Sequence, residues 1–188
     1  MEFCWGCGGK LEIIKDRPYH YRECGLDNVY LHGIIQYRCP ECGEEAPEIP
    51  ELKELHLLIA KELVCKGELM EGAEIRFLRK ELRLKSKEMA ELLSITPETY
   101  SRWENSREII SEGSDSQLRY LYILNAEDKA GRVLHEGIRF ARSLASKKST
   151  RKIRNGRKIE DRKPVKIDIS ISEWVMPHTE PIFTEECY

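Results

Sequence analysis

The chain has 188 residues, of which 40% are hydrophobic and 34% charged, and its formal net charge is −2. This length allows one ordinary domain or two small ones. No apolar stretch is long enough to span a bilayer, and the first ten residues, which include acidic and cysteine residues, do not resemble a secretory signal. We therefore expect a soluble, cytoplasmic protein with a folded core, a highly charged surface and no membrane partner.

Charge is distributed unevenly along the chain. Residues 1–50 carry five Lys/Arg and nine Asp/Glu, residues 131–163 carry twelve and three, and residues 164–188 carry one and five. The net charges of these blocks are −4, +9 and −4. Blocks of opposite sign predict separate modules with different partners.

Four of the seven cysteines form two matched pairs, Cys4-Trp-Gly-Cys7 and Cys39-Pro-Glu-Cys42, and a glycine follows each pair. Two residues between the thiols let a tight turn aim both sulfurs at one ion, and two such turns supply a closed tetrahedral set. A set of this kind is typical of structural rather than catalytic zinc. The sequence therefore predicts one structural Zn²⁺ bound by Cys4, Cys7, Cys39 and Cys42.

A redox dithiol is the alternative for the first pair, but it requires a preceding strand, for which Cys4 lies too near the first residue. The 31 residues between the pairs are polar and β-leaning, so we expect two or three short strands there, in a domain that depends on its metal for folding. His20, Cys24 and His32 are spare candidate ligands. Because four thiolates already complete the set, we expect Cys24 to pack in the core and the histidines to lie on the surface.

Residues 51–126 have apolar residues at helical spacing. A connecting helix is expected over 51–66, followed by helices over 73–84, 86–93, 96–105 and 115–125. Met89, Leu92 and Leu93 are predicted to face inward, with the small Ala90 at a close helix crossing. Two short helices joined by a tight turn predict a helix-turn-helix.

The helix that begins at Thr96 has an N-cap followed by Pro97 at the first helical position, which is a strong start signal. Tyr100 and Trp103 are predicted to face the core. Arg102 then lies on the outer face, where a guanidinium can form two parallel hydrogen bonds to a guanine. The alternative is a solvated surface of an ordinary helical bundle. The candidate DNA contacts are Lys85, Ser86, Lys87, Thr96, Pro97, Glu98, Thr99, Ser101, Arg102, Asn105 and Arg107.

Residues 72–130 have a net charge of −1, which is low for a module that binds DNA by neutralising phosphates. A cationic face would compensate for this balance. The cations that we expect to share such a face are Arg79, Lys80, Arg83, Lys85, Lys87, Arg102 and Arg107.

These motifs together resemble a known family. The segments 74–82, 87–93 and 96–105 are similar to the XRE/Cro-type helix-turn-helix, and a CxxCG…CxxCG domain with Lys15-Asp-Arg-Pro-Tyr19 precedes them. This combination, over residues 3–125, resembles the MqsA antitoxins, also called YgiT-type zinc-finger proteins. The resemblance implies a homodimer that binds a palindromic double-stranded DNA operator, and a zinc domain that neutralises a toxin protein, usually an RNase.

In that family the position matching Arg102 contacts a base. The sequence departs from the family at three places. Glu98 replaces a common amide, Lys85-Ser86 replaces a Ser-Gln pair so that the usual capping box is lost, and Ser94 replaces a turn glycine. These changes leave the fold expectation intact and alter the expected operator sequence.

Residues beyond 130 lie outside the resemblance. We expect a helix over 130–148 and a disordered basic tract over 147–163, either a solvated linker or a DNA-backbone contact. Strict alternation over 165–172 predicts a strand. Its partner is left open between a second chain, another protein's sheet edge and the zinc domain. Trp174, Met176 and Phe183 are expected anchors.

The expected fold class is α+β: a small Zn(Cys4) β-rich domain (1–48), a connecting helix (49–71), a lambda-repressor-like helix-turn-helix bundle (72–128) and a helical and basic C-terminal extension ending in a strand (129–188). The leading functional hypothesis is a DNA-binding repressor acting as the antitoxin of a toxin–antitoxin pair. The alternative is a stand-alone metal- or redox-responsive regulator. No arrangement of residues predicts an enzyme.

Overall fold

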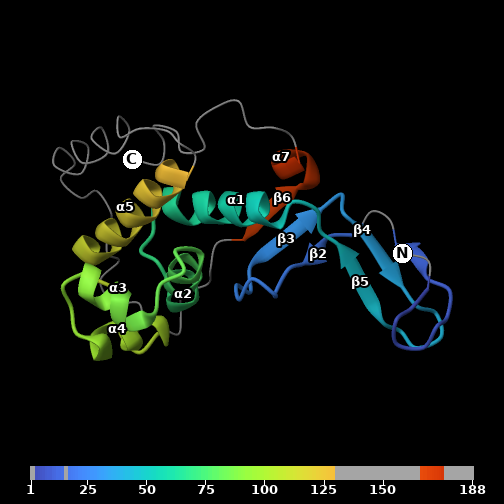
Figure 1. The fold of residues 1–188 in the computed structure, drawn as a ribbon, viewed down its shortest axis with the longest axis horizontal. Coiled ribbons are helices and arrows are strands. Elements are labelled where there is room, and N and C mark those ends of the chain that lie inside the picture. The colour runs from blue at the N-terminus through green and yellow to red at the C-terminus, as the bar shows by residue number, and fades with distance from the viewer. Residues whose placement is uncertain (1–2, 15–16, 130–165, 176–188) are drawn as a thin grey trace. The chain divides into compact units, whose positions relative to one another are not determined.

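The computed structural model describes residues 3–14, 17–129 and 166–175, and it has the expected mixed α+β class (Figure 1). The described residues divide into two compact units. The first contains the chain up to Ile59 together with residues 166–175, and the second runs from Ala60 to Lys129. No helix in these described ranges is long and apolar enough to cross a membrane.

One sheet of the first unit brings the two cysteine pairs together: two of its strands lie between the pairs in sequence and the third follows the second pair. It consists of β1 (Glu12–Ile14), β4 (Ile35–Arg38) and β5 (Glu45–Glu48) in the order β1-β4-β5, with antiparallel neighbours. Because β1 follows the first pair and β4 leads directly into the second, their pairing brings the two cysteine turns to one end of the sheet (Figure 1).

The other sheet has the order β2-β3-β6 and takes its third strand from the far end of the chain. β2 (Tyr19–His20) is antiparallel to β3 (Val29–His32), and β6 (Ile167–Ser170) runs parallel to β3. β1 to β4 all fall between the cysteine pairs, so this interval holds four strands rather than the two or three that we expected.

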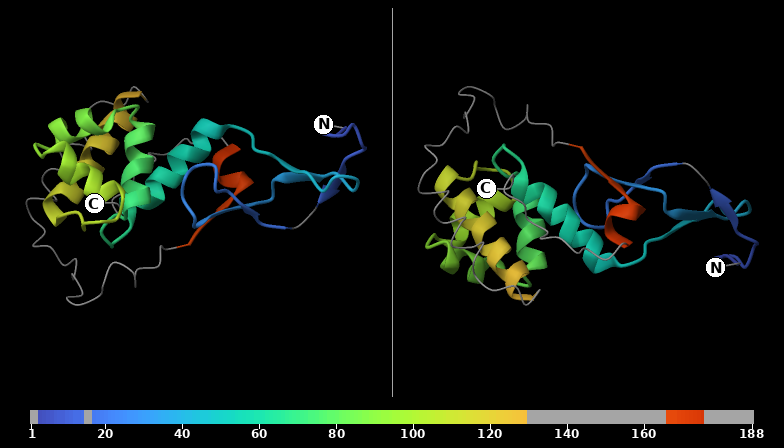
Figure 2. Two further views of the ribbon diagram at one scale, coloured as in Figure 1. Left: turned by 90° about the horizontal axis from the view of Figure 1, so that it is seen from below. Right: turned by 90° about the horizontal axis from the view of Figure 1, so that it is seen from above.

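β6 confirms the predicted strand character of this segment, although it ends at Ser170, where the short helix α7 (Ile171–Val175) begins. Of the three partners left open, the structure shows a strand of the cysteine-containing domain of the same chain. β6 pairs with β3 and lies beside it in both views of Figure 2. Ile167 and Ile169 are 7% and 3% exposed, so alternation directs both isoleucines into the core of the first unit.

The second unit is helical. α1 (Leu52–Cys65) contributes its C-terminal half, and α2 (Gly72–Glu81), α3 (Ser86–Leu92), α4 (Pro97–Glu104) and α5 (Glu112–Lys129) follow. All five expected helices are present. The larger side chains that are at most 1% exposed include Leu63, Val64, Ile75, Leu78, Met89, Tyr100, Leu118 and Ile123.

Three details of the helices differ from the sequence expectations. α5 runs from Glu112 to Lys129 and is longer at both ends than the expected 115–125. α2 ends at Glu81 rather than near residue 84, and Arg83 then takes a positive φ of 58° that a helix does not allow. Leu92, expected to face inward, is 52% exposed and lies at the last position of α3, so the prediction was wrong.

Several expectations concern residues outside the described ranges. These are the helix over 130–148, the basic tract over 147–163, and Met176 and Phe183 as anchors. The side chain of Trp174 is also outside what the structure describes.

Candidate metal centre and DNA-binding surface

The two cysteine turns have the same main-chain hydrogen bonds. The N–H of Gly8 donates to the carbonyl of Cys4 at 2.8 Å, and the N–H of Gly43 donates to that of Cys39 at 2.9 Å. Both glycines have a φ of 77°, and nothing lies within 4 Å of where a Cβ would stand. The glycine after each pair is therefore needed for its backbone conformation and not for space.

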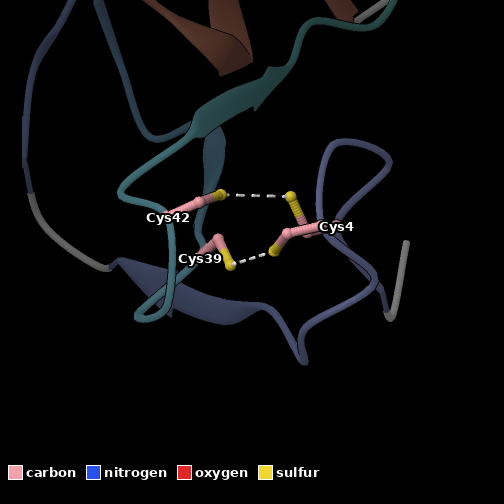
Figure 3. A group of neighbouring side chains, drawn as sticks. Cys4, Cys39 and Cys42 are labelled. Carbon is pink, nitrogen blue, oxygen red and sulfur yellow. Dashed lines mark hydrogen bonds between the residues drawn. The ribbon is translucent and has the colours of Figure 1, made fainter.

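The four sulfurs converge on one point. The Sγ atoms of Cys4 and Cys42 are 3.6 Å apart, those of Cys7 and Cys39 are 3.4 Å apart, and all four lie within 4.8 Å of one another (Figure 3). Sulfurs at about 2.3 Å from a tetrahedral ion have edges of roughly 3.8 Å. The donor set and its spacing thus fit a four-coordinate, thiolate-bound metal ion with no open position.

The sulfurs differ in their surroundings: hydrogen bonds from neighbouring thiols raise the pKa of Cys7 and Cys42, whereas the pKa of Cys39 is lowered. The main-chain N–H of Cys42 lowers the pKa of the Cys39 thiol to about 7, and the N–H of Gly9 donates to the sulfur of Cys7 at 3.4 Å. Cys4 and Cys39 are buried, whereas Cys7 and Cys42 are exposed. Two of the four ligands therefore belong to the buried part of the domain, and solvent can reach the cluster from the side of Cys7 and Cys42.

The spare candidate ligands have other partners. Buried Cys24 donates its thiol to the carbonyl of Tyr21 at 3.1 Å, and the Nε2 atoms of His20 and His32 lie 3.0 Å from the carbonyl of Asp27 and 2.8 Å from the carboxylate of Asp168. Within the described ranges, the four-cysteine cluster is the one group of metal-ligating side chains close enough to hold an ion.

The start of α4 confirms the expected capping. The hydroxyl of Thr96 accepts the N–H of Thr99 at 3.2 Å, and Pro97 occupies the first turn. Tyr100 and Trp103 are buried, with ring centroids 6.3 Å apart in an edge-on arrangement. This packing fixes which face of α4 points outward.

The outward face of α4 carries the expected polar residues. Glu98, Ser101, Arg102 and Asn105 are exposed, and Thr99 is half-buried. Nη1 of Arg102 lies 3.4 Å from Oε2 of Glu108, while the amide of Asn105 donates to the carbonyl of Ser101 at 2.8 Å. Arg102 is held by one exposed ion pair and is 55% exposed at its side chain.

The capping box at the start of α3 is only half lost. We expected it to disappear with Lys85-Ser86, but the carboxylate of Glu88 accepts the N–H of Lys85 at 2.6 Å. The reciprocal bond is missing because a lysine side chain has no acceptor. In the turn that follows, Ser94 takes a φ of 55° in place of the common glycine.

Arg79 does not belong to the expected cationic face. Its side chain is 14% exposed, and it donates to the carboxylate of Glu104 and to the carbonyl of Leu84, each at 2.8 Å. The hydroxyl of Ser86 donates to the other oxygen of Glu104 at 3.1 Å. Glu104 therefore ties α2 and α3 to the end of α4. The cations that remain exposed are Lys80, Arg83, Lys85, Lys87, Arg102 and Arg107.

Sequence reasoning did not find Glu104. Its partners lie 25 and 18 positions away in the chain, and no local pattern marks a carboxylate that accepts from two other helices. The charge-assisted bonds compensate for burying this group, which is 7% exposed.

Comparison with known proteins supports the helix-turn-helix in the second unit. A helix-turn-helix family model matches residues 75–113, which run from α2 into the start of α5 and include α3, α4 and the turn between them. No curated protein matches the chain. The chain thus contains a helix-turn-helix domain of the kind found in DNA-binding transcription regulators, after a four-cysteine cluster near its first residues.

Proposed function

We propose that this protein is a dimeric transcriptional repressor and the antitoxin of a type II toxin–antitoxin pair, as its resemblance to the MqsA antitoxins implies. The observation that carries the proposal is the pairing of two modules in one chain, a four-thiolate cluster followed by a helix-turn-helix domain. The first module binds the toxin and the second binds a palindromic operator. Neither module acts as an enzyme.

The DNA-binding half is supported by the exposure of the outer face of α4. Arg102 is free to reach a base once its exposed pair with Glu108 opens, a step that costs little because surface ion pairs are weak. Lys85, Lys87, Thr96 and Arg107 lie near the helix starts or the loop after α4 and meet phosphates. In this arrangement phosphate contacts position the domain and Arg102 selects the sequence.

The metal half is supported by the closed set of sulfurs. Cys4, Cys7, Cys39 and Cys42 hold one Zn²⁺, which supplies structural cross-linking of the two turns. The first unit has a small core, so the ion contributes much of its folding free energy. All four coordination positions are filled by thiolates, which leaves none for a reacting water.

The toxin-binding half is supported by exposed apolar side chains in an acidic surrounding. Phe3 and Trp5 are 62% and 80% exposed beside the cluster, and Ile13 and Ile35 are 55% and 43% exposed on β1 and β4. Ile13 lies opposite Tyr37, two positions from Ile35, so both isoleucines share one sheet face. The exposed carboxylates of the same region are Glu12, Glu41, Glu44, Glu45 and Glu48.

Exposed apolar side chains in a region with exposed carboxylates suit a basic partner such as an RNase, because the charges steer the encounter and the apolar contacts hold the complex. The test is co-purification with the product of the adjacent gene. Ile13→Asp should weaken that complex, whereas Leu92→Asp, an equally drastic change at an exposed leucine of the second unit, should leave it intact. Failure of the wild-type protein to bind the neighbour or relieve its toxicity would remove the antitoxin role.

A second candidate function is regulation by metal or thiol oxidation. The exposure of Cys7 and Cys42 lets an oxidant reach two of the four sulfurs of the cluster. Reversible zinc release under mild peroxide that changes operator affinity, without any protein partner, would support it.

A further inference from the structure

A cavity of about 240 Å³ opens in the second unit, between the start of α2 and the loop that follows α4. It is small for a ligand site, with room for a single-ring molecule. Its wall is formed by Met70, Glu71, Gly72, Ile75, Trp103, Ser106, Glu108 and Ile109.

The floor of the cavity is apolar. Met70, Ile75 and Trp103 are 2%, 1% and 4% exposed, and Ile109 at the rim is 39% exposed. Among the described residues, the indole N–H of Trp103 is one of two buried side-chain polar atoms without a hydrogen-bond partner. Such a floor suits a flat hydrophobic group, since its burial removes apolar surface from water.

The charge of the wall has one sign. Glu71 and Glu108 are the acidic residues of the wall, and none of its eight residues is basic. A ligand with an apolar ring and an ammonium group therefore matches the cavity, whereas an anionic ligand of the same shape is repelled.

The cavity is joined to the DNA-binding face through Glu108 and Gly72. Glu108, which contributes to the wall, is the ion-pair partner of Arg102 at 3.4 Å. A Cβ at Gly72 would stand 2.6 Å from the carbonyl oxygens of Trp103 and Glu104, so the wall also touches the end of α4. A ligand that pairs with Glu108 therefore competes directly with the ion pair of Arg102.

We propose that this cavity binds a small aromatic amine and that binding raises the affinity of the protein for DNA. The ammonium group pairs with Glu108, which releases Arg102 to contact a base and neutralises a carboxylate near the phosphates. The effect on DNA rests on the proposed function, whereas binding in the cavity does not.

Tyramine is a suitable probe because it combines one ring with one ammonium group. The double variant Trp5→Phe/Trp174→Phe leaves Trp103 as the single tryptophan, so its indole ¹H–¹⁵N signal reports on the cavity. We expect a saturable shift of this signal at millimolar tyramine and none with 3-(4-hydroxyphenyl)propionate, which carries a carboxylate instead. No saturable shift, or equal shifts with both probes, would overturn the proposal.

Ile109→Phe places a larger side chain at the rim of the cavity and should abolish the tyramine shift without unfolding the domain, since Ile109 is partly exposed. Persistence of the shift in a folded Ile109→Phe protein would place the amine elsewhere and contradict the assignment.

The coupling to DNA is measured by anisotropy with the DNA upstream of the gene. Tyramine should raise the affinity about two- to five-fold, the range expected for an exposed ion pair. Glu108→Gln should raise it similarly and remove the tyramine effect, while Glu91→Gln, an exposed carboxylate of α3 outside the wall, should retain it. Unchanged affinity in wild type with bound tyramine would refute the coupling. Absence of any DNA binding would instead count against the proposed function and leave the indole result to decide the site.

Discussion

The guanidinium of Arg119 donates a hydrogen bond of 2.5 Å to the main-chain carbonyl of Val64, although 55 positions separate the two residues. The same side chain donates to the carbonyls of Lys66 and Glu68 at 2.8 and 2.6 Å, and its charge is balanced by Asp115 at 2.8 Å. The last carbonyls of a helix have no partner within the helix. Here one buried arginine of α5 satisfies the carbonyls of Leu63 and Val64 at the end of α1 and those of Lys66 and Glu68 in the loop that follows.

Arg119→Leu should therefore be strongly destabilising. It leaves Asp115 buried without its cation and several carbonyls without a donor, and loss of one member of a buried pair costs about 3–5 kcal/mol. Urea unfolding followed by circular dichroism measures the change. Arg107→Leu, at an exposed arginine of the same domain, should alter stability by less than ~0.5 kcal/mol. A similar small loss for both variants would show that the Arg119 bonds contribute little.

Gly72→Ala should destabilise the second unit, because the added methyl group meets two main-chain carbonyl oxygens of α4 at 2.6 Å. Backbone atoms cannot move aside as a flexible side chain can, so we expect a loss of about 1–3 kcal/mol, typical of overpacking. Gly113→Ala is the matched control: its Cβ meets nothing within 4 Å in α5, and alanine should stabilise the helix by roughly 0.5–1 kcal/mol. Thermal unfolding should show a lower midpoint for Gly72→Ala and a higher midpoint for Gly113→Ala. Equal shifts of the two midpoints would contradict this account.

Cys39→Ser should abolish stoichiometric zinc binding and remove the native amide signals of the first unit, while the signals of α2 to α5 persist. The physical reason is that three thiolates no longer close the tetrahedral set on which a small domain depends. Elemental analysis and an amide spectrum test this. Cys24→Ser changes another buried thiol that lies outside the cluster, and it should retain the metal. Full zinc content in the Cys39 variant would disprove the four-thiolate site.

Arg102→Ala should weaken operator binding by about 1–3 kcal/mol and relax the preference at one base pair. Lys87→Ala should weaken binding to all sequences alike and reduce the salt dependence, because a phosphate contact carries no sequence information. Titrations with the upstream DNA and with single-base variants separate these effects. Equal affinity and unchanged selectivity in the Arg102 variant would exclude it as a base contact.

The docking of β6 should weaken in acid. Lys166 and then His32 hold the pKa of Asp168 below its ordinary value of 3.8. A lowered pKa in the folded state stabilises the fold fully above the ordinary value, and this contribution disappears as pH falls through the lowered one. Hydrogen exchange of the β6 amides should accelerate below pH 3.8 beyond the intrinsic trend. Asp168→Asn should remove this acid dependence, and a persistent dependence in that variant would point to another group.

Local patterns predicted the features that need only neighbouring residues. The CxxCG turns close through bonds between residues four or five positions apart, such as Gly8 to Cys4 and Cys4 to Gly9. The cap of α4 likewise depends on Thr96 and Thr99 alone. Alternation predicted a strand over 165–172, of which residues 167–170 form β6, but a row of alternating side chains contains no information about which strand it joins.

The sequence by itself therefore determined the metal-binding turns, the start of α4 and the outward face of that helix, because each arises from chemistry within one turn of chain. Tertiary structure alone decided that β6 pairs with β3, that Arg79 forms an ion pair with Glu104 instead of joining the cationic face, and that Arg119 caps α1. These bonds join residues 25 to 138 positions apart, and only burial in a shared core, which removes the competing water, makes one distant partner preferable to another.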